Sequence, residues 1–171
     1  AALVPICFTG IFVATGLGWM DNPQLVRSST REGNPQELLR GPLYYGIIFV
    51  ICTLVFWRQS PVGMMALMMM SGGDGLADVV GRRWGSRKLP FNPDKSWVGS
   101  AAMFTGSVVF AGIMLAVFNG LGYFVPVLPL GQTAGALVAI ALVATLVEAL
   151  PLQDIDNITL TGVAIALGLV W

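Results

Sequence analysis

Two aspartates and an arginine, spaced four residues apart, could together bind a metal ion and a phosphate group. Asp74, Asp78 and Arg82 follow one another at this interval, so a helix places all three side chains on one face. Carboxylates are oxygen ligands that suit a divalent cation such as Mg²⁺, and guanidinium groups bind phosphate oxygens. The spacing therefore predicts a site for a divalent cation and a phosphorylated ligand.

Glycines surround the first of these aspartates. Gly72, Gly73 and Gly75 flank Asp74, although each glycine costs a helix about 1 kcal/mol relative to alanine. Such crowding indicates that the backbone approaches something closely here. The segment lacks both the GK[ST] of a P-loop and the spacing of a dinucleotide fingerprint. The simpler interpretation is a helix end that leaves a membrane with a few ion pairs along its surface.

The charged residues are concentrated in one part of an otherwise apolar chain. Of 171 residues, 56% are hydrophobic and 11% charged, and the mean hydropathy is +0.78. Residues 71–99 hold 8 of the 18 formal charges, whereas residues 96–147 contain none. That uncharged stretch is long enough for two membrane crossings. The composition predicts an all-α, polytopic integral membrane protein built as a helical bundle.

Several kinds of function are excluded or disfavoured by composition. The chain has no histidine, so it contains no Ser-His-Asp triad, Cys-His pair or histidine-ligated zinc. Cys7 and Cys52 fall in separate apolar segments, which favours packing over a disulfide or a metal site. The formal net charge is zero, and we expect no nucleic-acid partner.

The apolar pattern predicts about six membrane segments and places the polar loops. The segments are residues 3–20, 42–57, 61–80, 97–118, 132–150 and 155–171. Counting crossings puts residues 21–40, 82–95 and 151–157 on one side, which then holds 8 of the 9 Lys and Arg residues. This asymmetry fits the positive-inside rule. We expect one membrane-embedded domain over residues 1–171, N-terminally truncated because the chain opens inside an apolar segment without Met.

A further acidic group follows the fifth segment. Glu148 lies near the end of that segment, and Asp156 and Asn157 follow Pro151. Crossing counts put this group on the same side as Asp74, so the two groups could share a site. The alternative is an acidic loop at the membrane surface, solvated by water. Similarly, the basic residues between 82 and 95 could anchor the chain to anionic lipid head groups.

Three strings carry a resemblance to a known family. Residues 72–100, GGDGLADVVGRRWGSRKLPFNPDKSWVGS, resemble the signature of the polyprenol kinases, which include dolichol, phytol and farnesol kinases and are distantly similar to phosphatidate cytidylyltransferases. Residues 29–46, STREGNPQELLRGPLYYG, and residues 143–161, VATLVEALPLQDIDNITLT, resemble the phytol kinase branch.

The resemblance implies phosphoryl transfer from CTP, or another nucleoside triphosphate, to a prenyl alcohol dissolved in the bilayer, with phytol favoured. For this reaction we expect Mg²⁺ to be held by Asp74 and Asp78, because the ion takes oxygen ligands, and we expect these two and Lys95 to be the catalytic residues. The implied nucleotide-binding residues are Gly73, Gly75, Arg82, Arg83, Lys95, Ser96, Arg31 and Arg40, and further candidates are Glu148, Asp156 and Asn157. The expected location is a plastid (chloroplast) membrane, or a cyanobacterial membrane if the source is not a plant or alga.

Three alternatives stay open at this point. A cytidylyltransferase that forms a CDP-lipid could use the same triphosphate site but release pyrophosphate. A transporter would place its ionisable groups near the middle of the membrane or show paired broken helices. A purely structural membrane subunit is the third possibility.

Overall fold

The computed structural model describes residues 2–30, 32–56, 60–152 and 155–171. The chain divides into two compact units, an N-terminal unit, Ala1–Leu54, and a C-terminal unit, Val55–Trp171. The expectation of a single domain over the whole chain stays a prediction, and each unit is described here by itself.

The N-terminal unit consists of four helical elements, and polar side chains cap the start of two of them. They are α1 (Leu3–Gly16), α2 (Pro23–Ser29), the 3₁₀ helix η1 (Pro35–Leu39) and α3 (Gly41–Val55). The Asn22 side chain accepts from the Leu25 backbone N–H at 3.1 Å and begins α2, as an N-cap residue does. Asn34 and Glu37 form a capping box at η1. Gly46 lets α3 approach α1, since a Cβ there would lie 2.3 Å from Thr9 Oγ1.

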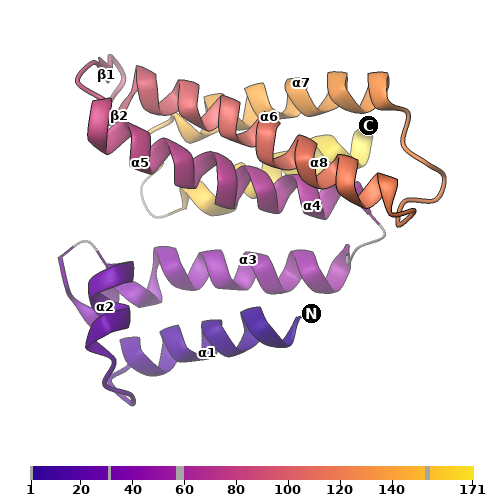
Figure 1. Cartoon of the computed structure of the whole chain (residues 1–171). Helices are drawn as coiled ribbons and strands as arrows, with labels where there is room; N and C mark the ends of the chain where they lie inside the picture. Colours follow the sequence, from indigo (N-terminus) through magenta and orange to yellow (C-terminus); the bar gives the residue numbers. More distant parts are fainter. Residues whose placement is uncertain (1, 31, 57–59, 153–154) are drawn as a thin grey trace. The chain divides into compact units, whose positions relative to one another are not determined.

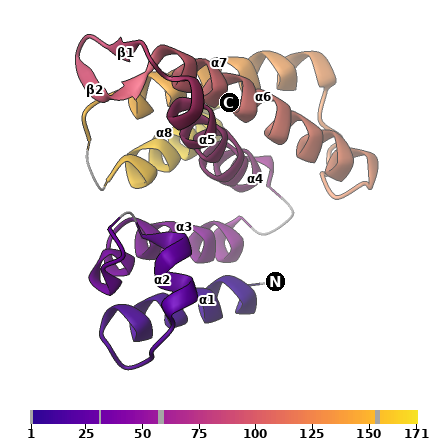
Figure 2. The ribbon, with the colours of Figure 1, turned by 60° about the vertical axis from the view of Figure 1, so that its left-hand side comes forward.

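The C-terminal unit is a bundle of four helical rods with a small hairpin at one end (Figures 1 and 2). The first rod runs continuously through α4 (Pro61–Met68), the π-helical segment η2 (Met69–Asp74) and α5 (Gly75–Trp84). Strands β1 (Lys88–Leu89) and β2 (Asn92–Ser96) pair antiparallel. Helices α6 (Trp97–Gly120), α7 (Leu130–Glu148) and α8 (Asp156–Val170) complete the unit.

The four rods pack in a ring. Helix α6 contacts the α4–η2–α5 rod and α7, while α8 contacts α7 and α4. Methionines fill much of the interior, because Met65, Met69, Met70 and Met103 are fully buried. Flexible thioether side chains suit such irregular interior space. These methionines are therefore packing residues of the bundle.

Glycines bring η2 and α6 into close contact. A Cβ on Gly73 would lie 2.2 Å from Ser107 Oγ and 3.1 Å from the Met103 carbonyl oxygen. A Cβ on Gly106 would lie 3.0 Å from the Gly72 carbonyl oxygen. Gly75, by contrast, faces open space, with nothing within 4 Å of an added Cβ. Part of the glycine crowding around Asp74 is therefore explained by helix packing.

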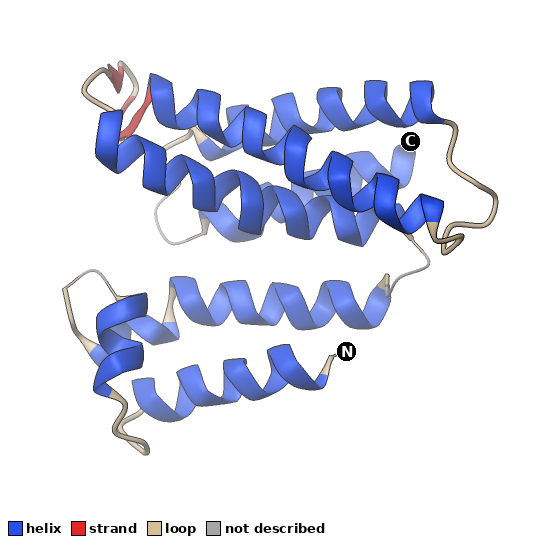
Figure 3. Ribbon diagram, in the orientation of Figure 1, coloured by secondary structure: helices blue, strands red, loops and turns tan. Residues whose placement is uncertain are grey.

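The helices confirm the predicted all-α architecture of the membrane type (Figure 3). By length and composition, Pro35–Val55, Trp97–Gly120 and Gly131–Glu148 can each cross a membrane, and Leu3–Gly16 and Asp156–Val170 are shorter apolar helices. The predicted segment 61–80 is also helical, but its helix extends to Trp84 and includes the π-helical turn before Asp74. A π-helical turn widens the helix locally and is often found at functional sites.

Candidate active site

Four elements of the C-terminal unit meet at one end of its bundle (Figure 1). They are the end of α5, the β1–β2 hairpin, the last turn of α7 and the first turn of α8. Residues 82–95 and the described part of 151–157 thus lie at the same end, in agreement with the crossing count. The polar residues 21–40 belong to the N-terminal unit and are described only within it.

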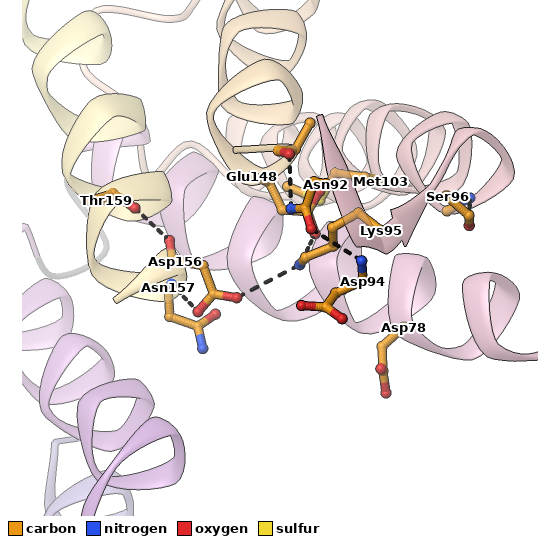
Figure 4. A network of polar contacts seen from close by, with 12 residues as sticks. Asp78, Asn92, Asp94, Lys95, Ser96, Met103, Glu148, Asp156, Asn157 and Thr159 are labelled. Atoms are coloured by element: carbon orange, nitrogen blue, oxygen red, sulfur yellow. Dashed lines mark hydrogen bonds and ion pairs between the residues drawn. The ribbon is translucent and has the colours of Figure 1, made fainter. Parts of the chain in front are cut away.

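Lys95 occupies the centre of this end. Its ammonium donates a hydrogen bond to Glu148 Oε1 and lies 3.6 Å from Asp156 Oδ2. The Glu148 side chain is 3% exposed, whereas those of Lys95 and Asp156 are 28% and 27% exposed. Figure 4 shows Lys95 reaching from β2 toward the first turn of α8. One cation therefore joins β2 to α7 and α8, two consecutive helices that lie far along the chain from it.

The charge state of Lys95 follows from its neighbours. Burial lowers the pKa of the ammonium, but the charge and hydrogen bond of Glu148, followed by the charges of Asp74 and Asp156, raise it, and the net shift is upward. Lys95 is therefore a stable cation at neutral pH. Because Asp74 acts on it, Asp74 belongs to the same electrostatic cluster. We call Asp74, Lys95, Glu148 and Asp156 the Lys95 cluster.

Asn92 fixes the hairpin that carries Lys95. Its side-chain amide donates to the Ala149 carbonyl oxygen at 3.0 Å, and its side-chain oxygen accepts from the Asp94 backbone N–H at 3.1 Å. The first bond satisfies a carbonyl at the end of α7, which the helix itself leaves without a partner. The sequence reasoning missed this residue. The Asn92–Pro93 pair was an available signal, because asparagine before proline favours a turn closed by its side chain.

The predicted metal ligands lie in different surroundings. Asp74 ends the π-helical segment and is partly buried, while Asp78 is exposed on α5. Asp78 Oδ1 accepts from Arg82 Nε at 2.7 Å, and its Oδ2 lies 2.6 Å from Arg82 Nη2. In Figure 4 the Asp78 carboxylate points away from Lys95. The prediction of a shared helix face is confirmed for Asp78 and Arg82, which form an ion pair with each other.

No group of three or more histidine, cysteine, aspartate or glutamate side chains is arranged to hold a metal ion among the described residues. The site of Asp74 and Asp78 for Mg²⁺ therefore stays a prediction.

The predicted nucleotide-binding residues of the C-terminal unit lie in different surroundings. The Arg83 guanidinium lies 5.6 Å from the centre of the Trp84 ring. Ser96 is buried at the start of α6, where its hydroxyl accepts from the Gly99 N–H at 3.1 Å. Gly73 is buried against α6, and Gly75 is exposed on the helix surface.

Three further predicted residues have separate positions. Arg31 lies outside the described residues, and Arg40 is exposed in the N-terminal unit. Asn157 donates its backbone N–H to Asp156 Oδ1 at 2.9 Å. The buried side-chain oxygen of Asn157 has no hydrogen-bond partner in the described part of the chain.

The architecture and the site define an all-α protein of the polytopic membrane class, with a cluster of charged residues at one end of a helical bundle. Curated relatives add the family. The chain is 53% identical over 161 residues to a probable chloroplastic phytol kinase of Triticum aestivum, 51% to one of Oryza sativa subsp. japonica and 42% to phytol kinase 1 of Arabidopsis thaliana. Each alignment covers 93% of this chain.

These relatives confirm the family: the chain belongs with the phytol kinases among the polyprenol kinases. The chain spans about half the length of the curated relatives it matches, between 51% and 53% for the three named above. No family model matches the chain, and no solved structure matches it.

Proposed function

We propose that the protein phosphorylates a prenyl alcohol, phytol in the first instance, with a nucleoside triphosphate, CTP in the first instance, as the phosphoryl donor. The proposed location is a chloroplast membrane. The names of the relatives, phytol kinase and chloroplastic, support the acceptor and the location. The predicted choice of CTP rests on the resemblance of residues 72–100 to the polyprenol kinase signature.

One observation carries the assignment of the site. Lys95, a cation on a hairpin at the end of the bundle, is held by the buried Glu148 and lies within the electrostatic influence of Asp74. Phosphoryl transfer requires mainly positioning and neutralisation of charge. An ammonium is a compact charge that can bind phosphate oxygens. We assign this role to Lys95, with Arg82 and Arg83 as further phosphate ligands.

Asp74 and Asp78 are the proposed holders of Mg²⁺. When bound, the ion would neutralise charge on the phosphates of the donor. For Asp78 this assignment requires that its carboxylate exchange the guanidinium of Arg82 for the metal, and the exposure of that pair permits the exchange. Asp74 is partly buried and acts electrostatically on Lys95.

The end of the bundle is a suitable place for the two substrates to meet. A long isoprenoid alcohol dissolves in the bilayer, whereas a nucleoside triphosphate arrives from water. The Lys95 cluster lies where the apolar helices α6 and α7 give way to polar residues. A hydroxyl group at the membrane surface could therefore reach a triphosphate bound by the hairpin.

The test is to follow each phosphorus of the donor. Full-length protein in detergent is incubated with phytol, Mg²⁺ and CTP labelled at either the γ or the α phosphorus, and the lipid extract is analysed. We expect label in the lipid from γ-labelled CTP only. Label from α-labelled CTP would instead indicate a CDP-lipid and a cytidylyltransferase. The Asp74→Asn variant serves as the control for contaminating kinases, with activity lowered on the order of 10²-fold.

A further inference from the structure

The two carboxylates that contact Lys95 are not equivalent. Glu148 is buried, and its Oε1 accepts a hydrogen bond from the ammonium. Asp156 Oδ2 lies 3.6 Å away, which is longer than the 2.7–3.2 Å of a normal hydrogen bond between nitrogen and oxygen. Glu148 is thus the firm partner of Lys95 in the described structure, and Asp156 is the looser one.

The two partners also differ in their access to water. The side chain of Asp156 is about as exposed as that of Lys95, at 27% and 28%, whereas Glu148 is 3% exposed. An ion pair open to water contributes little stability and exchanges partners readily. The side of Lys95 that faces Asp156 is therefore the side from which a soluble anion can approach.

The ammonium has donor capacity for such an anion. It carries three N–H donors, and in the described part of the chain one acceptor, Glu148 Oε1, meets hydrogen-bond criteria. A phosphate oxygen carries charge and can come within 3 Å of the ammonium. It would then satisfy a donor that Asp156 leaves without a short hydrogen bond.

We infer that Asp156 occupies the position on Lys95 that a phosphate oxygen of the nucleotide takes, so that the nucleotide displaces Asp156 while Glu148 keeps Lys95 in place. This inference rests on the proposed function. It makes Asp156 a competitor of the donor substrate and Glu148 a positioning residue. It also predicts that removing the charge of Asp156 strengthens nucleotide binding, whereas substitution of a residue in a binding site usually weakens it.

The Asp156→Asn variant tests the inference with little disturbance of the fold. Asparagine keeps a side-chain oxygen, so it can still accept the backbone N–H of Asn157 that Asp156 Oδ1 accepts at 2.9 Å. We expect the apparent KM for CTP to fall about two- to fivefold, with kcat and the KM for phytol little changed. This fall in KM is the size expected when the partly exposed ion pair between Asp156 and Lys95 no longer competes with the nucleotide.

Asp94→Asn is the matched control, because it removes the same charge from the exposed neighbour of Lys95 on β2. We expect it to change the KM for CTP less than twofold. An unchanged or raised KM for CTP in Asp156→Asn, relative to this control, overturns the inference. A large loss of kcat also overturns it, since Asp156 would then take part in the chemistry.

Direct binding of CTP with Mg²⁺ to the purified full-length variants provides a readout that does not depend on turnover. The Kd should fall in Asp156→Asn by the same factor as the KM. If the wild-type protein transfers no γ-phosphoryl group to phytol, the proposed function fails. If the wild type is active but Asp156→Asn binds CTP no more tightly, only the present inference fails.

Discussion

Lys95 and Glu148 form a partly buried ion pair at the end of the bundle. The two residues are 53 positions apart in the sequence, and their contact joins β2 to the last turn of α7. A charge held in this way keeps its position when a ligand arrives, which is what an electrostatic site requires. The sequence could predict that both residues lie on one side of the membrane. It could not predict their pairing, because no local pattern links residues so far apart.

Glu148→Gln should shift the pH dependence of nucleotide use. Glu148 is the largest of the influences that raise the pKa of Lys95, and burial opposes them. Without the charge of Glu148 the pKa of Lys95 falls. The ammonium of the variant therefore loses its proton at a lower pH than that of the wild type. We expect the alkaline limb of kcat/KM for CTP to move to lower pH.

The Glu148→Asp variant keeps the negative charge. The alkaline limb of its pH profile of kcat/KM for CTP should therefore lie closer to that of the wild type. The pH profiles are measured on protein matched for folded amount, so that any loss of stability in the variants is removed from the comparison. An alkaline limb at the wild-type pH in Glu148→Gln would show that Glu148 does not control Lys95.

At the scale of elements, the π-helical segment Met69–Asp74 and its contact with α6 are the main features that the sequence did not predict. The glycine cluster correctly indicated close backbone approach, but the partner for Gly72 and Gly73 is α6. Apolar periodicity does not distinguish an α-helix from a helix with one wider turn. The contact with Ser107 and Met103 depends on tertiary packing, which a single sequence does not reveal.

The glycines on the two sides of Asp74 should respond differently to alanine. Gly73→Ala places a Cβ 2.2 Å from Ser107 Oγ and 3.1 Å from a backbone oxygen, so we expect a loss of about 1–3 kcal/mol in the free energy of unfolding. Gly75→Ala meets nothing within 4 Å and should be neutral or gain up to about 1 kcal/mol from helix propensity. Denaturant unfolding in micelles measures both. Equal stability of the two variants would contradict the packing described for η2.

At the scale of the whole molecule, the predicted apolar segments match the observed helices to within a few residues at most ends. Long uncharged runs such as residues 96–147 leave the chain few alternatives to membrane helices. The side of each loop follows from counting crossings and from the distribution of Lys and Arg. The positions of Arg31 and Arg40 relative to the Lys95 cluster stay a prediction, since Arg31 lies outside the described residues and Arg40 belongs to the N-terminal unit.

Cysteine labelling tests this arrangement across the membrane. Single cysteines at Gln36, Ser86 and Gln132, all exposed, are introduced into a background without Cys7 and Cys52. We expect the first two to react with a membrane-impermeant thiol reagent from one side and the third from the other. Reaction of Ser86 and Gln132 from the same side would contradict the orientation of α6 and α7 in a membrane.

The central claim is that the bundle end around Lys95 binds the phosphoryl donor, and Lys95→Met tests it most directly. The KM values for CTP and for phytol are measured on the full-length variant, with Lys95→Arg retaining the charge and Lys88→Met as an exposed control on the same hairpin. All variants are matched for folded amount.

The expected result is a KM for CTP raised about tenfold or more in Lys95→Met, as for loss of one charged hydrogen bond, a smaller rise in Lys95→Arg, and a KM for phytol that changes little. Lys88→Met should leave both values near those of the wild type. If Lys95→Met lowers the yield of inserted protein but leaves the KM for CTP unchanged, Lys95 anchors the hairpin to lipid and the claim is wrong.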